Sequence, residues 1–216
     1  MKQMAFILIV LGLFISCNNI HSNENFSDSL SVRQNPGVST KASERQLLIK
    51  LLKNIQAVFA SNDKEKIAQT FKFPLADTTF SFYIDDSTFQ TEYKRNDNRT
   101  TKAMFIKYFS KISHNIEFDQ LNQLFKQVNL DKLTQKDTLE KELRNNKEKC
   151  YKFYHVFVDK DLVTLEFGSN TNNNFADNSK KPKDDESFGD ECEFSSIWLF
   201  HFDGKQLQFI KQMAAG

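Results

Sequence analysis

The hydrophobic repeat changes once along this chain, and the change limits what the chain can fold into. Leu48, Leu51, Leu52 and Ile55 recur at the spacing of one helix face. From Tyr154 onward, apolar residues instead alternate with their neighbours, which is the repeat of a strand buried on one face. Helical segments followed by alternating segments predict an α+β fold, with N-terminal helices packed on a C-terminal antiparallel sheet of at least two hairpins.

Helix boundaries are predicted from capping and helix-breaking residues. The spacing of Ser43 and Gln46 fits a capping box, so the first helix is expected to begin there. A second helix is expected to begin at Asn62 and to stop at Phe73-Pro74, because proline cannot continue a helix. Further helical repeats cover residues 99–112, 118–128 and the charged stretch 137–147. The stretch 79–89 is rich in β-prone residues and predicts a weak strand.

Two hairpins are expected in the C-terminal third. A turn at Lys160-Asp161 places three apolar pairs opposite one another, Val158 with Val163, Val156 with Leu165 and Tyr154 with Phe167. A two-residue turn at Asp203-Gly204 pairs Phe202 with Lys205, Phe200 with Leu207 and Trp198 with Phe209. The apolar face of this second hairpin is expected to pack on the helix face of Leu48, Leu51, Leu52 and Ile55.

The N-terminus predicts export. Lys2 precedes an apolar run from Met4 to Ile15, and the run ends at Ser16-Cys17. A positive charge, an apolar core and a small residue before the cut form a secretory signal peptide, and this core is too short to span a bilayer as a helix. Residues 1–16 are therefore expected to be the signal peptide.

Phe14-Ile15-Ser16-Cys17 resembles the lipobox of bacterial lipoproteins, although Phe14 stands where leucine is usual. The resemblance implies lipidation of Cys17, a membrane partner held through that lipid, and a place in the bacterial cell envelope with the domain outside the cytoplasm. Residues 17–41, polar and without a repeat, are expected to be the lipidated cysteine and a flexible tether. Residues 42–216 then form a single α+β domain, with a disordered insert at about 169–191.

Charge argues against nucleic acid as a partner. Removal of residues 1–16 takes away Lys2 and no acidic residue, which leaves 28 basic residues against 28 acidic ones. Nucleic-acid-binding proteins carry a basic excess that meets the phosphates, and this chain has none. The 22 phenylalanines are expected to fill the core, because each ring buries a large area.

The chain lacks the short motifs of common enzymes. It has no Gly-x-Ser-x-Gly, no Gly-rich phosphate loop, no His-Glu-x-x-His and no Cys-x-x-Cys. The acidic run Asp184-Asp185-Glu186 lacks the spacing of a calcium loop. No cofactor and no metal are therefore expected.

Three side chains are weak candidates for chemistry. In the first hairpin His155 lies opposite Glu166, and His201 is expected on the corresponding face of the second hairpin. A carboxylate beside a histidine fixes its tautomer and raises its basicity, as in a general base or a metal site. Cross-strand His and Glu pairs also occur as ordinary surface neighbours, and Phe153 and Phe157 share this face, so the favoured interpretation is a half-exposed packing surface.

Cys150 and Cys192 remain after Cys17 is assigned to lipid. An oxidising compartment predicts that they pair as a disulfide. In a simple meander, however, one whole strand separates them, and two strand spacings come to roughly 9.5 Å, beyond the limit of about 7 Å between bridged Cα atoms. The pairing requires that Cys192 belong to the return of the insert and not to the next strand.

The order of helices and hairpins resembles the cone-shaped nuclear transport factor two-like and cystatin-like folds. The ending, Trp198-x-Phe200 through Asp203-Gly204 to Leu207 and Ala215-Gly216, is similar to that of many small bacterial lipoproteins. This resemblance implies a pocket at the mouth of the cone but no particular activity.

Two alternative functions are compatible with the sequence. The favoured one is a noncatalytic envelope module that binds a small apolar ligand, a cell-wall fragment or an envelope protein. The alternative is an enzyme that uses a pocket histidine or carboxylate.

Overall fold

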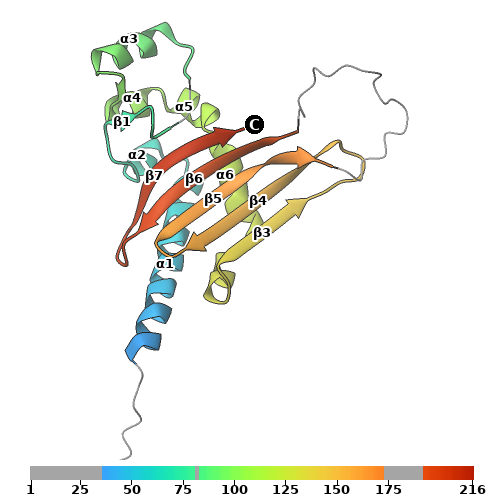
Figure 1. The fold of residues 1–216 in the computed structure, drawn as a ribbon. Helices are drawn as coiled ribbons and strands as arrows, with labels where there is room; N and C mark the ends of the chain where they lie inside the picture. The colour runs from blue at the N-terminus through green and yellow to red at the C-terminus, as the bar shows by residue number, and fades with distance from the viewer. Residues whose placement is uncertain (1–35, 81–82, 173–191) are drawn as a thin grey trace, which may run out of the picture. The chain divides into compact units, whose positions relative to one another are not determined.

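The computed structural model describes residues 36–80, 83–172 and 192–216 (Figure 1). The predicted signal peptide, Cys17, the tether as far as residue 35 and most of the predicted insert lie outside the described residues. Helical elements come first: α1 (Pro36–Ala60), α2 (Lys64–Ala68), α3 (Ser87–Arg95), α4 (Lys102–Lys107), α5 (Phe109–Asn115), α6 (Phe118–Gln127) and a 3₁₀ turn, η1 (Leu130–Thr134).

Two antiparallel sheets complete the fold. The short strands β1 (Leu75–Ala76) and β2 (Arg99–Thr100) pair with each other. The large sheet has five strands in sequence order: β3 (Thr138–Leu143), β4 (Cys150–Asp159), β5 (Leu162–Thr171), β6 (Phe194–Phe202) and β7 (Leu207–Ala215). Helices that precede an antiparallel sheet confirm the predicted α+β class.

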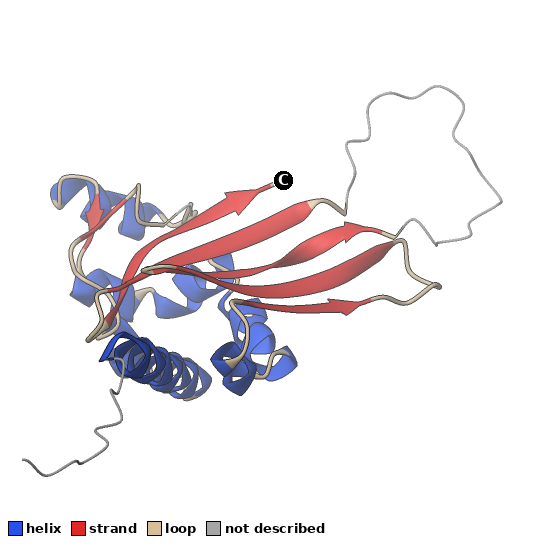
Figure 2. Ribbon diagram, turned by 60° about the horizontal axis from the view of Figure 1, so that its bottom comes forward, coloured by secondary structure: helices blue, strands red, loops and turns tan. Residues whose placement is uncertain are grey.

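The helices lie along one face of the large sheet, as Figure 2 shows. The core forms between them, from the inward-facing residues of the strands and the apolar faces of α1, α4, α5 and α6. Trp198 is fully buried at its centre and contacts the rings of Phe59, Phe71, Phe80, Phe118 and Phe209. The second hairpin and the α1 face of Leu48, Leu52 and Ile55 share this core, as predicted, and the aromatic rings around Trp198 add a counter-surface that was not predicted.

The first predicted hairpin is confirmed pair by pair, including Val158 opposite Val163 and Tyr154 opposite Phe167. The second hairpin has a different register: Phe202 pairs with Leu207 and Phe200 with Phe209. The turn is longer than predicted because the Asp203 carboxylate accepts hydrogen bonds from the backbone N–H groups of both Lys205 and Gln206. A bulge beside Leu199 then shifts the rest of the ladder.

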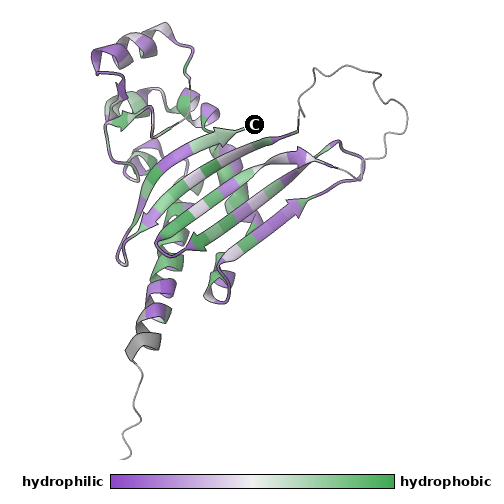
Figure 3. Cartoon of the chain, viewed as in Figure 1, coloured by the Kyte–Doolittle hydropathy of each residue, from purple (hydrophilic) through white to green (hydrophobic). Residues whose placement is uncertain are grey.

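The charged stretch 137–147 is not a helix as predicted, because residues 138–143 form the edge strand β3. Leu139 points into the core opposite Val156, whereas Glu140 and Glu142 point away from it. A charged edge strand resists pairing with another chain, and β3 is drawn as hydrophilic over most of its length in Figure 3. Tertiary pairing with β4 therefore overrides the helical spacing of Leu139 and Leu143.

The described residues of the stretch 79–89, which are 79–80 and 83–89, do not form the predicted strand. Its last residues begin α3, whose first turn is capped by Asp86: the carboxylate accepts a hydrogen bond from the N–H of Phe89 at 2.9 Å. The stretch 99–112 is helical from Lys102 onward, with a break at Tyr108 between α4 and α5, and it begins with β2.

Other boundaries also differ from prediction. Helix α1 begins at Pro36, so Ser43 lies inside it and the predicted tether is helical from residue 36. The N-cap of α2 is Asp63, whose carboxylate accepts two backbone N–H groups, and Asn62 takes a left-handed conformation just before it. Residues 169–171, predicted as part of the insert, belong to β5.

Cys150 and Cys192 form a disulfide, with Cα atoms 5.3 Å apart. The strand-spacing argument against this disulfide assumed that Cys192 lies in the strand after β5. That assumption is wrong, because β6 begins only at Phe194. Cys192 precedes that strand and crosses the end of β5, where the Ser169 hydroxyl donates to the Cys192 carbonyl at 2.6 Å. The chain between the two cysteines therefore returns close to the start of β4.

Candidate functional site

The face of the large sheet that points away from the helices is the main candidate site, and we call it the outer face. Strand alternation places every second side chain there. Its central side chains are Phe153, His155, Phe157, Leu162, Thr164, Glu166, Ile197, Leu199, Lys211 and Met213. Most of them are half-buried by one another, and no helix of the described residues covers them (Figure 2).

A row of rings runs along β4 on the outer face. The ring of His155 stacks on Phe153 at a centroid distance of 4.9 Å and meets Phe157 edge-on at 5.5 Å. At the end of the row, the Arg144 guanidinium lies 3.6 Å from the ring centroid of Tyr151. Phe153 and His155 therefore turn one ring face each toward the other, whereas the ring of Phe157 lies at 71° to that of His155.

The predicted pairing of His155 with Glu166 is confirmed, and Glu140 lies on its other side in the same cross-strand row. The Nδ1 atom of His155 is 3.4 Å from a carboxylate oxygen of Glu166. The histidine therefore lies between two carboxylates and two phenylalanine rings. This geometry keeps the imidazole in place on an open surface.

His201 is on the same face but does not join this group. Its Nε2 atom is 3.0 Å from a carboxylate oxygen of Asp161, in the turn of the first hairpin. It lies opposite Leu162, which is four residues along β5 from Glu166. In the described ranges, no group of three or more His, Cys, Asp or Glu side chains is placed to share a metal ion.

Apolar side chains continue the outer face across β5, β6 and β7. Ile197 of β6 lies opposite Glu166 of β5 on one side and Met213 of β7 on the other. Leu199 of β6 lies opposite Thr164 of β5. Leu162 is 41 % exposed. The outer face thus joins aromatic and aliphatic side chains into one surface, and acidic residues border it on the β3 side.

Gly168 leaves room for the ring of Phe153 on this surface. A Cβ at this position would meet the Cζ atom of Phe153 at 2.8 Å and the carbonyl oxygen of Phe194 at 2.0 Å. Only glycine fits between the ring and the neighbouring strand. Sequence reasoning placed Phe153, Phe157 and His201 on this face. It did not identify Gly168, Ile197 or Leu199, and it could not assign the residues of β7, because their positions follow from the bulged register.

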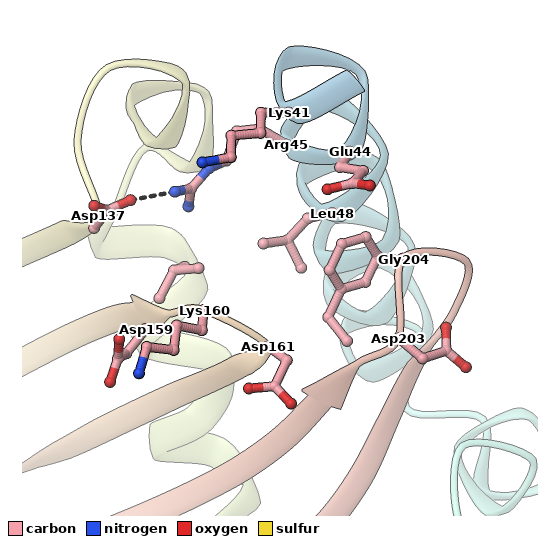
Figure 4. Close-up of a pocket in the computed structure, with 12 residues that line it drawn as sticks. Lys41, Glu44, Arg45, Leu48, Asp137, Asp159, Lys160, Asp161, Asp203 and Gly204 are labelled. Atoms are coloured by element: carbon pink, nitrogen blue, oxygen red, sulfur yellow. Dashed lines mark hydrogen bonds and ion pairs between the residues drawn. The ribbon is translucent and has the colours of Figure 1, made fainter. Parts of the chain in front are cut away.

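A cleft of about 750 Å³ lies where the start of α1 meets the two hairpin turns. Figure 4 shows its charged residues, which come from α1, the start of β3 and the turns: Lys41, Glu44, Arg45, Asp137, Asp159, Lys160, Asp161 and Asp203. Leu48, Val158 and Phe202 form its apolar floor. Arg45 forms an ion pair with Asp137, so charges of both signs already compensate each other here.

A smaller cleft, of about 130 Å³, contains Glu117. This residue has a left-handed backbone conformation, with φ at 53°, and one carboxylate oxygen is buried without a hydrogen-bond partner. Burial raises the pKa of the Glu117 carboxyl group, an effect that the nearby positive charges of Lys152 and His114 only partly oppose. Sequence reasoning gave no signal for this group.

The pocket expected at the mouth of a cone stays a prediction. The rings around Trp198 fill the space between helices and sheet, and the clefts described above lie at the ends of the elements. Neither cleft is lined by His155, Glu166 or His201. The sequence candidates therefore lie on an open face and not in a cavity.

Comparison of the chain with known protein families, with curated proteins and with solved structures finds no match. None of the helices in the described part of the chain is both long and apolar enough to cross a membrane. The assignment to a cone-shaped fold family stays a prediction.

Proposed function

We propose that this chain is a lipoprotein of the bacterial cell envelope whose α+β domain binds a partner protein through the outer face, without catalysis of its own. The observation that carries the binding role is the outer face itself. Strands β4 to β7 place aromatic and aliphatic side chains on this face, together with Thr164, Glu166 and Lys211, and the described helices leave it uncovered. Contiguous apolar patches on a folded domain mark sites of interaction.

The chemistry of the outer face favours a protein segment over a stacking ligand. Sugars and bases need a free ring face to stack on, whereas Phe153 and His155 already stack on each other and His155 meets Phe157 edge-on. Apolar side chains of a partner can pack against this half-buried row. Glu140 and Glu166 lie beside the rings. A partner that offers apolar side chains next to lysine or arginine is complementary in both shape and charge.

The alternative of an enzyme has less support. The His155 and Glu166 pair lies on an open face, where water has free access and no cleft wall positions a substrate. Catalytic histidine and carboxylate pairs act in concave sites that exclude water and hold the reacting atoms.

The envelope location rests on residues 1–17, with support from the disulfide. A bridge between Cys150 and Cys192 fits a domain outside the cytoplasm, where thiols are oxidised. Lipidation of Cys17 is tested by Cys17→Ala. We expect the wild-type protein to sediment with membranes and to carry an acylated N-terminal cysteine by mass spectrometry, and the variant to leave the membrane fraction. An unmodified wild-type N-terminus would overturn the assignment.

The outer face is tested by crosslinking with a matched pair of leucines. Leu162 lies on the outer face and is 41 % exposed, whereas Leu143 points to the opposite side of the sheet and is 39 % exposed. A photo-crosslinking residue at position 162 in intact cells should give one discrete crosslinked product. The same residue at position 143 should not.

Charge complementarity gives the second arm of this test. Glu140→Lys combined with Glu166→Lys should reduce the crosslink from position 162 at least severalfold, whereas Glu65→Lys on α2 should not change it. A product with twice the mass of the chain would show that a second copy occupies the face and would overturn the proposal of a different partner. Equal labelling from positions 162 and 143 would overturn the outer face as the site.

A further inference from the structure

A separate pocket, of about 180 Å³, lies between the small sheet and α3, and none of its lining residues belongs to the large sheet. Four of these residues are aromatic: Phe80, Tyr83, Phe89 and Tyr93. The others are Leu75, Ala76, Asp77, Ile84, Gln90 and Thr100, so Asp77 is the one charged residue among those that line it. We call this site the aromatic pocket.

The structure holds the walls of the aromatic pocket in place. Phe89 and Tyr93 are one helical turn apart on α3, and their rings stack with centroids 5.7 Å apart and planes 15° apart. Phe89 also meets the ring of Tyr108 edge-on, and Phe80 is buried against Trp198. The Gln90 side chain donates to the carbonyl of Ile84 at 2.9 Å, which ties α3 to the opposite wall.

Tyr83 stands apart from these buried walls, because it is 69 % exposed, the most exposed of the large apolar side chains in the described part of the chain. An aromatic ring left in water at the rim of a pocket lined by other rings has no role in the packing of the core. It is available to contact a ligand.

Rings around a single carboxylate favour a cation. The face of an aromatic ring attracts positive charge, by roughly 0.5–1 kcal/mol for each exposed contact and about 2 when water is excluded. The carboxylate of Asp77 adds a favourable charge at the rim. A neutral apolar group would pack against the rings but would make no favourable electrostatic interaction with this carboxylate.

The pocket favours a quaternary over a primary ammonium group. A primary ammonium group has three N–H donors and loses free energy when they are buried without acceptors. In the aromatic pocket Asp77 is the one carboxylate that could accept from them, and Gln90 is already bonded to Ile84, whereas a quaternary ammonium group needs no acceptor. The volume lies below the roughly 300–1,000 Å³ of drug-sized sites, so it suits one small group.

We propose that the aromatic pocket, formed by Phe80, Tyr83, Phe89, Tyr93 and Asp77, binds a quaternary ammonium group of the choline type. This site is independent of the outer face and of lipidation at Cys17. The same group occurs free and in lipid head groups, so the test compares both sources.

Choline and its neutral isostere 3,3-dimethyl-1-butanol form the decisive pair of probes, because they differ only in the charge of the central atom. Calorimetric titration uses the mature full chain in a maltoside detergent. Choline is expected to bind about tenfold more tightly than the isostere or better. Tyr83→Ala and Asp77→Asn should each weaken choline binding about three- to tenfold, and both residues are exposed enough to be replaced without loss of the fold.

Phe157→Leu and Asp161→Asn are matched controls, since they remove a ring and a carboxylate elsewhere on the domain. Both should bind choline as the wild type does. Tighter binding of glycerophosphocholine than of choline would assign the site to lipid head groups, and the reverse to free ligands. Absence of choline binding, equal affinity for the neutral isostere, or equal losses in the control variants would overturn the proposal, and none of these results bears on the outer face.

Discussion

Glu117 combines two unfavourable features at a single residue. Its backbone is in the left-handed region, and one of its carboxylate oxygens is buried without a partner. Because burial raises its pKa above the ordinary value of 4.5, the folded protein holds this proton more tightly than the unfolded chain does. Its contribution to stability is therefore present at low pH and is lost as the pH rises above that value.

Glu117→Gln is therefore expected to raise the melting temperature at pH 7, because it removes the charge that the fold disfavours. At pH 4 and below, where the wild-type carboxyl group is protonated, the difference should shrink toward zero. Thermal melts followed by circular dichroism at both pH values measure this. Glu65→Gln, at an exposed position on α2, is the control. A variant that melts below the wild type at pH 7 would contradict the prediction.

Gly168 is a second residue whose identity is dictated by its surroundings, because the neighbouring atoms leave no room for a Cβ. An alanine Cβ would lie 2.0 Å from a backbone oxygen of β6, so the strands themselves must shift. Gly168→Ala should cost about 1–3 kcal/mol of folding free energy, as overpacking does. Denaturant unfolding measures this cost. Adding Phe153→Leu should restore only part of it, because the backbone contact remains, and full recovery would show that the ring alone is responsible.

At the scale of elements, Trp198 is the fully buried centre of the contacts between the second hairpin and the rest of the core. Trp198 contacts rings from α1, from α6 and from the segment between α2 and α3. Trp198→Ala should therefore cost about 3–5 kcal/mol, the usual range for a fully buried large side chain.

Urea unfolding of Trp198→Ala beside Tyr83→Ala checks this expectation, since Tyr83 is aromatic but 69 % exposed. The exposed variant should stay within about 0.5 kcal/mol of the wild type. A small loss of unfolding free energy in Trp198→Ala would mean that the hairpin contributes little to the packing of the helices on the sheet.

At the scale of the whole molecule, the disulfide ties the start of β4 to the start of β6 across a sequence separation of 42 residues. Closing a loop of this length in the unfolded chain is worth about 4 kcal/mol in the chain-entropy account. The Cys150→Ser, Cys192→Ser double variant should lose stability on that order in denaturant unfolding. Two alkylatable cysteines in the unreduced, denatured wild type would contradict the bridge itself.

Patterns within the sequence determined the elements with strong local repeats. The first hairpin was predicted with its pairs because alternation and a two-residue turn fix the register together, and this placed His155 opposite Glu166. Helix α6 was predicted because four apolar residues recur at helical spacing. In both cases, local and tertiary preferences agree.

Tertiary structure alone decided the rest. The spacing of Leu139 and Leu143 favours a helix, yet pairing with β4 makes their segment an edge strand. Asp203 lengthens its turn through two backbone hydrogen bonds, and the bulge that follows sets which residues of β7 reach the outer face. The aromatic pocket and the partly buried Glu117 have no local signature. They arise where segments distant in sequence meet, and contacts of that kind depend on packing, which no repeat along a single segment encodes.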